Sequence, residues 1–168
     1  KDDAGLIFSP TDDIILDTAP PGAAEGLSGL AGHEKTILEW TDPGDLDLAL
    51  IEIWRGPWHD GSNVSAYPEY DDLPGDLIPT RPADRAAADA SLEWTLAGTA
   101  LPGDEAFTDN FAPRGVYYYE LFAKDLAGNY GPPLDETIRV MNYWLGDVRP
   151  LPSYDGSVDV ADISALAS

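Results

Sequence analysis

Oxygen-bearing side chains recur at short intervals near the C-terminus of the chain. Asp155, Ser157 and Asp159 alternate around Gly156, and Asp162 follows three residues later. Calcium prefers several hard oxygen ligands on a loop that bends sharply at a glycine. A short segment with periodic apolar residues comes next in the sequence. The spacing therefore predicts a calcium loop that leads into a short C-terminal helix.

This segment resembles the first half of a dockerin, the calcium-loop module that binds cohesin. The matching residues are Gly146-Asp147-Val148 and Asp155-Gly156-Ser157-Val158-Asp159-Val160-Ala161-Asp162. The resemblance implies a set of metal ligands and a pair of partner-recognition residues. The implied ligands are Asp147, Asp155, Ser157, Asp159 and Asp162, with Ser153 as a substitute ligand, and the implied partner contacts are Val160 and Ala161.

The segment departs from the dockerin pattern in two ways. Val148–Tyr154 separate the first and fifth ligand positions, where the family has three residues, and the second calcium repeat is absent. The alternative is a plain turn at Asp155-Gly156, with Asp159 and Asp162 capping a terminal helix.

Two other acidic loops offer cation ligands or, alternatively, turn formers. The first holds Asp42, Asp45 and Asp47, and the second holds Asp71, Asp72 and Asp76.

Four aromatic residues are candidates for stacking on sugar rings: Trp54, Trp58, Tyr67 and Tyr70. Trp54 is expected to point away from the core if its neighbours Ile51 and Ile53 point inward. The alternative is that these rings pack a long loop onto a sheet.

Catalytic motifs find little support in the sequence. His33 and His59 share no metal-binding spacing, and the chain has no Gly-x-Ser-x-Gly and no Gly-rich phosphate loop. With 31 acidic side chains, pairs that mimic a glycosidase dyad arise by chance. We therefore expect a protein that is not an enzyme.

The charge balance narrows the class of partner. The chain of 168 residues carries 31 acidic and 9 basic side chains, a net charge of −22. Such a field repels nucleic acid and anionic membranes, and it favours divalent cations or a basic partner. The chain has no cysteine, and no apolar run approaches the roughly 20 residues of a membrane span. The calcium-loop motif after a β-rich region leads us to expect a secreted or cell-surface protein.

Short runs with β-strand character are separated by turns rich in Gly and Pro. Several runs alternate apolar and polar residues, which is typical of half-buried strands in an antiparallel sandwich. The runs are Thr36–Trp40, Leu50–Arg55, Glu93–Ala97, Glu105–Thr108, Val116–Lys124 and Thr137–Val140.

The region 27–142 resembles a fibronectin type III domain, an antiparallel β-sandwich. Leu38-Glu39-Trp40 fits a strand with an inward Trp, and Val116–Ala123 fits the strand that carries the tyrosine corner, here Tyr117. The resemblance implies a set of inward residues. The chain departs from the family pattern by a long insert at 56–92, in which Ala83–Ala90 favours one or two helical turns. The implied inward residues are Trp40, Ile51, Ile53, Tyr117, Tyr119, Leu121 and Ala123.

A short internal sequence repeat predicts a strand at the N-terminus. Lys1-Asp2-Asp3-Ala4-Gly5 repeats the pattern of Lys124-Asp125-Leu126-Ala127-Gly128, and a Pro and a β-like run follow in both places. We read residues 1–16 as the last strand of a preceding similar domain or as an exchanged strand, and 17–26 as a linker. The expected partner-binding residues of this strand are Ile14, Ile15 and Leu16, because an unpaired apolar strand needs a neighbour.

The sequence thus predicts an extracellular module that spaces, tethers or polymerises. Self-association through the N-terminal strand and the C-terminal segment would make it a fibre subunit. Calcium-dependent docking of a secreted polysaccharide-degrading protein and carbohydrate binding are the alternatives.

Overall fold

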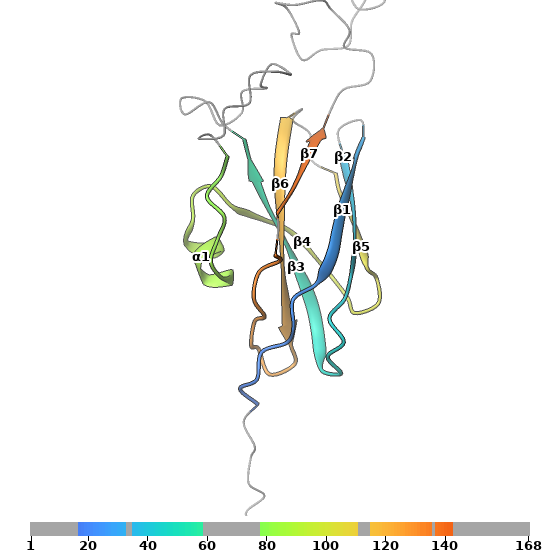
Figure 1. The fold of residues 1–168 in the computed structure, drawn as a ribbon, viewed down its shortest axis with the longest axis vertical. Helices are drawn as coiled ribbons and strands as arrows, with labels where there is room; N and C mark the ends of the chain where they lie inside the picture. The colour runs from blue at the N-terminus through green and yellow to red at the C-terminus, as the bar shows by residue number, and fades with distance from the viewer. Residues whose placement is uncertain (1–16, 33–34, 59–77, 111–114, 136, 143–168) are drawn as a thin grey trace, which may run out of the picture.

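The computed structural model describes residues 17–32, 35–58, 78–110, 115–135 and 137–142. Two antiparallel sheets pack face to face, and a single short helix lies outside them in the part of the chain that is described (Figure 1). The first sheet has the order β1-β2-β5, with bounds Glu25–Gly32, Lys35–Thr41 and Ala106–Asp109. The second has the order β4-β3-β6-β7, with bounds Thr95–Ala100, Leu48–Pro57, Gly115–Asp125 and Ile138–Asn142.

This strand order is that of a fibronectin type III-like sandwich, which confirms the predicted fold class. Each pair of neighbouring strands is antiparallel, and the longest ladder joins β3 to β6 at the centre of the second sheet. The predicted strands all appear, although β4 begins two residues later than the run that starts at Glu93. The predicted C-terminal helix lies outside the described residues.

The core forms where the two sheets face each other. Leu38 of β2 belongs to one buried cluster with Ile51 and Ile53 of β3 and with Tyr119 and Leu121 of β6. Successive side chains of a strand point to opposite faces, so the alternating patterns of β3 and β6 select these residues for the interior. All the residues expected to point inward belong to this buried cluster: Trp40, Ile51, Ile53, Tyr117, Tyr119, Leu121 and Ala123.

The two sheets approach closely at both lateral edges of the sandwich. A Cβ added to Gly29 of β1 would lie 2.4 Å from a methyl of Val140 in β7. At the opposite edge, a Cβ added to Gly98 of β4 would lie 2.5 Å from the ring of Phe107 in β5. Glycine is needed at both positions because the facing side chain occupies the space of a Cβ.

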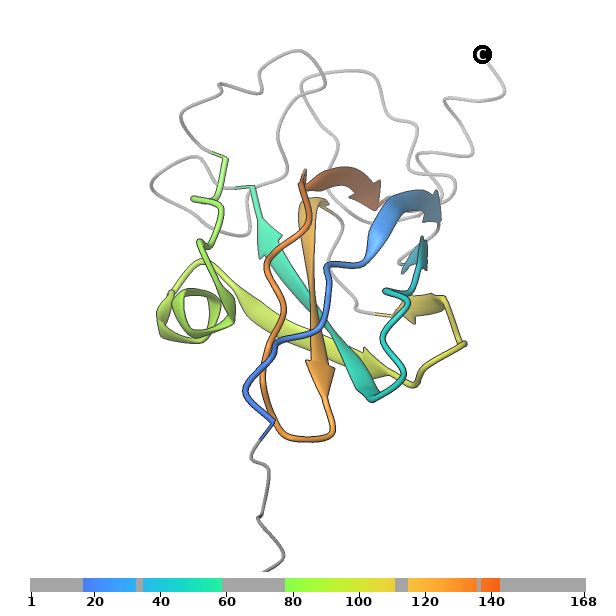
Figure 2. The same ribbon diagram turned by 60° about the horizontal axis from the view of Figure 1, so that its bottom comes forward.

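The outer face of the second sheet is covered by the end of the long insert. Helix α1, Arg85–Ala90, begins after Asp84, whose carboxylate accepts a hydrogen bond from the backbone N–H of Ala87. The helix lies beside the sheet in both views (Figures 1 and 2). Its buried Ala88 contributes to a second apolar cluster with Trp54, Val116, Tyr118 and Phe122 of the sheet and with Trp58 and Trp94 outside it. The helical turns predicted for Ala83–Ala90 are confirmed.

Strand β1 was not predicted, and it begins within the segment expected to be a linker. Gly26 has φ +64°, and a bulge separates Glu25, paired with Thr41, from Ser28, paired with Glu39. A run rich in Gly with one bulge shows no regular alternation, so its sequence gives no strand signal.

The residues before β1 also lie against the domain. The Asn129 side-chain amide donates to the carbonyl of Asp17 at 3.2 Å, and the N–H of Gly22 donates to Asp45 at 2.9 Å. Pro21 is buried. These contacts place part of the stretch expected to be a linker, 17–26, against the surface of the sandwich.

The described chain starts and ends at opposite poles of the sandwich. Asp17 lies at the pole formed by the β2–β3 loop and the β6–β7 turn, whereas β7 runs toward the other pole (Figure 1). The first pole is called the entry pole below and comprises Asp17, Asp45–Leu48 and Asp125–Asn129.

Candidate functional site

The two tryptophans proposed for sugar stacking are buried. Trp54 points away from the main core as expected, yet only 3% of it is exposed, and Trp58 is 5% exposed. Both rings lie in the cluster beneath the insert. The exposed platform expected from sequence therefore does not form at these two rings, because the insert packs over them. Tyr67 and Tyr70 lie outside the described residues.

An ion pair fastens the insert to the sheet beneath it. The Arg85 Nε of α1 donates to Glu52 Oε2 of β3 at 3.0 Å, and the same oxygen accepts from the Trp54 indole at 2.9 Å. Tyr130 donates its hydroxyl to the other carboxylate oxygen at 2.8 Å. Burial opposes ionisation of Glu52, but these donors outweigh it and lower the pKa of the carboxyl. The Arg85 guanidinium also lies over the Trp54 and Tyr130 rings.

A second arginine of the insert, Arg81, forms an ion pair with Glu120 on β6. Glu120 is fully buried, and it accepts from Arg81 Nε at 2.9 Å and from the N–H of Leu134 at 2.7 Å. Burial raises the pKa of Glu120, although Arg81 acts in the opposite direction. Arg81 also donates to the carbonyl of Asp135. These bonds fix the segment between β6 and β7 to the insert.

A third ion pair joins the two sheets. Arg55 of β3 donates to both carboxylate oxygens of Asp109 in β5 at 2.8 and 3.0 Å, and the buried Tyr119 hydroxyl donates to Asp109 at 3.1 Å. Burial raises the pKa of Asp109 against the effect of Arg55. The ring of Tyr117, the residue expected at the tyrosine corner, is buried under the Arg55 guanidinium.

Three carboxylates from distant parts of the sequence meet at the entry pole. One oxygen each of Asp17, Asp47 and Asp125 lies within 4.8 Å of the other two, the geometry of a candidate cation site. A backbone hydrogen bond acts to lower the pKa of Asp47, but the neighbouring Asp17 carboxyl, with help from Asp125, raises it overall. Carboxylates are hard ligands, so this group could hold calcium.

Hydrogen bonds already engage Asp125. Burial opposes ionisation of Asp125, but the side-chain amide and N–H of Asn129 and the N–H of Gly128 lower its pKa. These bonds build the β6–β7 turn, in which Gly128 adopts φ +98°. The carboxylate of Asp125 therefore has a structural role with or without a cation.

The other two aspartates of the β2–β3 loop have structural roles. Asp42 accepts from the Trp40 indole at 2.7 Å and from the N–H of Gly103 at 2.7 Å. Asp45 accepts from Gly22. Of the three loop residues proposed as cation ligands, Asp47 alone belongs to a group of three close carboxylates among the described residues.

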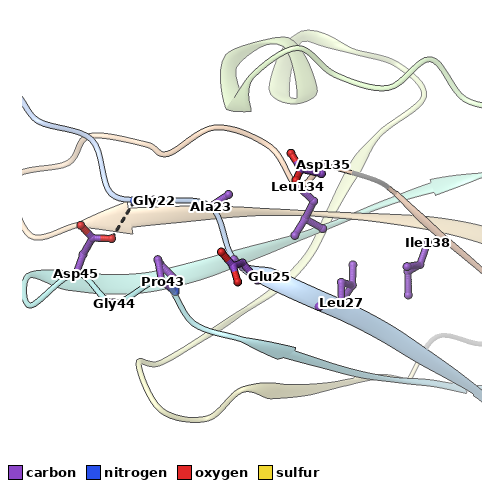
Figure 3. Close-up of a pocket in the computed structure, with 12 residues that line it drawn as sticks. Gly22, Ala23, Glu25, Leu27, Pro43, Gly44, Asp45, Leu134, Asp135 and Ile138 are labelled. Carbon is purple, nitrogen blue, oxygen red and sulfur yellow. Dashed lines mark hydrogen bonds between the residues drawn. The ribbon is translucent and has the colours of Figure 1, made fainter.

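A groove of about 770 Å³ runs along the edge of the sandwich between the start of β1 and the segment before β7. Leu27, Leu134 and Ile138 supply its apolar lining, and Glu25 and Asp135 add exposed carboxylates (Figure 3). None of the buried carboxylates described above lines this groove.

Several predicted site residues lie outside the described residues. They are the dockerin-like ligands Asp147, Ser153, Asp155, Ser157, Asp159 and Asp162, the partner contacts Val160 and Ala161, and the N-terminal Ile14, Ile15 and Leu16. Sequence reasoning did not anticipate Arg81, Arg85 or Glu120, because ion pairs across an insert leave no local pattern.

No helix among the described residues is long and apolar enough to cross a membrane.

No protein-family model matches the chain, and no curated protein matches it either. Among solved structures, the chain is similar to the fibronectin type III domain of human fibronectin type III domain containing protein 3. That match has 14% identity and a TM-score of 0.47, and it covers 82% of this chain and 97% of that one. The chain is also similar to the chicken CNTN1 FN1–FN3 domains, with 15% identity, a TM-score of 0.47, and coverage of 73% and 32%.

A β-1,2-glucanase from Parabacteroides distasonis matches with 17% identity and a TM-score of 0.47, over 77% of this chain and 14% of the enzyme. The chain spans about a third of the chicken CNTN1 structure. At these identities the similarity concerns the fold alone. The fibronectin type III-like fold of this chain rests on its own strand order and pairing.

Proposed function

We propose that the chain is a non-catalytic structural module of an extracellular or cell-surface protein, which spaces, tethers or polymerises its neighbours. The observation that supports this function most directly is that the described residues begin and end at opposite poles of the sandwich. Asp17 lies at the entry pole and β7 runs toward the opposite pole, so neighbouring parts of a protein attach at the two ends of the sandwich (Figure 1). A module with this geometry sets a distance between the parts it joins.

The buried charges of the described region support a structural role. Glu52, Asp109 and Glu120 each form an ion pair with an arginine. These ion pairs fix the insert to the sheet or one sheet to the other. A general acid or base needs a carboxyl group that can reach a substrate. These three carboxylates are committed to internal partners, which fits a rigid module better than an enzyme.

The acidic surface suits a partner that is a cation or a basic protein. A net charge of −22 keeps copies of the chain apart at low ionic strength and concentrates divalent cations near the surface. Calcium would weaken this repulsion. The distinction between a monomeric spacer and a fibre subunit is therefore expected to depend on calcium.

Light scattering on the full chain tests this function. The mass is measured in millimolar calcium and again after a chelator has been added. A polymer in calcium that dissociates in chelator supports a fibre whose joints need calcium, and a monomer in both conditions supports a spacer. Turnover of a glycan substrate by the purified chain would contradict the non-catalytic assignment.

Calcium-dependent docking is the second candidate function, and the sequence of the C-terminal segment favours it. Asp155, Ser157 and Asp159 follow the alternating pattern of a calcium loop. Calorimetric titration of the full chain with calcium is expected to show a binding event that the double variant Asp155→Ala/Asp159→Ala loses. Asp89→Asn, which removes an exposed charge from α1, is the control. Equal heats for all three proteins would contradict calcium binding at this loop.

Carbohydrate binding has less support. Burial of Trp54 and Trp58 leaves them unable to stack on a sugar without displacement of the insert.

A further inference from the structure

The turns at the entry pole expose two large apolar side chains. Leu46 is fully exposed at 105% of its reference area, and Leu126 is 78% exposed. Leu46 belongs to the β2–β3 loop, and Leu126 follows the last residue of β6. Turns of this kind usually carry Gly, Asn, Asp or Ser, so leucine on both is unexpected for a surface in water.

The two turns are adjacent. The N–H of Leu126 donates to the carbonyl of Asp47 at 2.9 Å, and Asp47 follows Leu46 directly. The two leucines therefore belong to one surface, although 80 positions of sequence separate them. Single exposed leucines are ordinary on proteins, but neighbouring ones at one pole suggest a contact.

The chain itself arrives at this surface. Asp17 is held by the Asn129 side chain at 3.2 Å, and its carboxylate lies within 4.8 Å of those of Asp47 and Asp125. The preceding residues are Ile14, Ile15 and Leu16. An extended chain advances at most about 3.6 Å per residue, so these three residues lie within about 11 Å of Asp17. Chain connectivity therefore keeps an apolar tripeptide within reach of the pole that carries the exposed leucines.

We propose that the entry pole is a docking surface for Ile14–Leu16 of the same chain, which pack against Leu46 and Leu126. The contact removes apolar surface of both the tripeptide and the two leucines from water. The short tether raises the effective concentration of the tripeptide to the millimolar range or above. The contact fixes the direction in which the preceding part of the chain leaves the sandwich. This inference rests on the proposed spacer function, because a spacer with a fixed entry direction also sets an angle between the parts it joins.

NMR on the full, isotopically labelled chain tests the contact. Methyl NOE cross-peaks are expected between Ile14 or Leu16 and Leu46 or Leu126, and the backbone heteronuclear NOE of residues 14–16 is expected to match that of β1. The double variant Leu46→Ser/Leu126→Ser removes the leucine methyls, and we expect the heteronuclear NOE of residues 14–16 to fall in it to the level of a free tail. Leu92→Ser is the matched control, since Leu92 is fully exposed but lies before β4, outside the entry pole.

Three results would overturn the inference. The first is a free-tail heteronuclear NOE for residues 14–16 in the unmodified chain. The second is the same loss of order in Leu92→Ser as in the double variant. The third is a cross-peak seen only between differently labelled molecules in a mixed sample, which would assign the surface to a second copy.

Failure of the docking contact and failure of the proposed function remain distinguishable. A free N-terminal segment on a monomeric, inactive chain would remove the docking contact and leave a spacer. Enzymatic turnover would remove the spacer function and leave the NOE result unaffected.

Discussion

The Arg85–Glu52 pair should decide whether the insert is a fixed part of the sandwich. We consider Arg85→Met, which keeps much of the length of the side chain and removes its charge. The variant loses a charge-assisted hydrogen bond of 3.0 Å, worth about 1.5–3 kcal/mol, and two cation–π contacts, each worth about 0.5–1 kcal/mol. Water that reaches the uncovered Glu52 carboxylate recovers part of this. We expect a net loss of about 2–3 kcal/mol in the free energy of unfolding.

Urea unfolding followed by tryptophan fluorescence measures this loss, because Trp54, Trp58 and Trp94 all lie in the cluster beneath the insert. The matched control is Asp89→Asn. Asp89 is the other partner of Arg85 but is solvent-exposed, so its loss should cost less than about 0.5 kcal/mol. Equal effects of the two variants, or a loss below about 0.5 kcal/mol in Arg85→Met, would refute the argument that the pair fastens the insert.

The same pair predicts a pH dependence with a definite sign. The folded-state pKa of Glu52 is lowered from its ordinary value of 4.5, so its ionised form contributes stability above that pH. This contribution is lost as the pH falls through the lowered pKa of the folded state. The difference in stability between the unmodified chain and Arg85→Met should therefore be largest near neutral pH and shrink below pH 4.5. A difference that grows on acidification would contradict the assignment.

Two further substitutions test the packing of the sandwich. Gly98→Ala should lower the free energy of unfolding in urea by about 1–3 kcal/mol, because its Cβ would lie 2.5 Å from the Phe107 ring. The control Gly44→Ala should be nearly neutral, because its Cβ meets no atom within 4 Å. Equal losses in the two variants would contradict the close approach of Gly98 to Phe107. Tyr119→Phe should cost about 1–2 kcal/mol in the same assay, because Asp109 loses a buried hydrogen-bond donor, and an unchanged midpoint would show that this bond contributes nothing.

The fold could be predicted because its signals are local. The alternation in Val116–Ala123 selects Tyr117, Tyr119 and Leu121 for the interior, and the structure places all three in the core. Gly/Pro turns mark the ends of the predicted strands. Strand β1 escaped prediction because Gly26 and Gly29 interrupt any apolar period, and its place depends on β2 and on the approach of β7.

The candidate site could be predicted only in part, because its residues come together across long sequence separations. Asp47 was recognised as a candidate cation ligand from its acidic loop. Asp17 and Asp125 could not be joined to it without the fold, since the linker and the β6–β7 turn meet that loop only at the entry pole. The outward direction of Trp54 was predictable from strand alternation, whereas its burial depends on Arg85 of the insert.

Single-molecule force spectroscopy tests the central claim most directly, because a spacer must keep its length under tension. The full chain is held by handles at its two ends and extended. We expect one all-or-none event that releases the strands and α1 together, with a contour-length gain of about 0.36 nm per released residue. Separate release of α1 before the strands, or gradual extension with no unfolding event, would contradict the account of the described sandwich as a single rigid module.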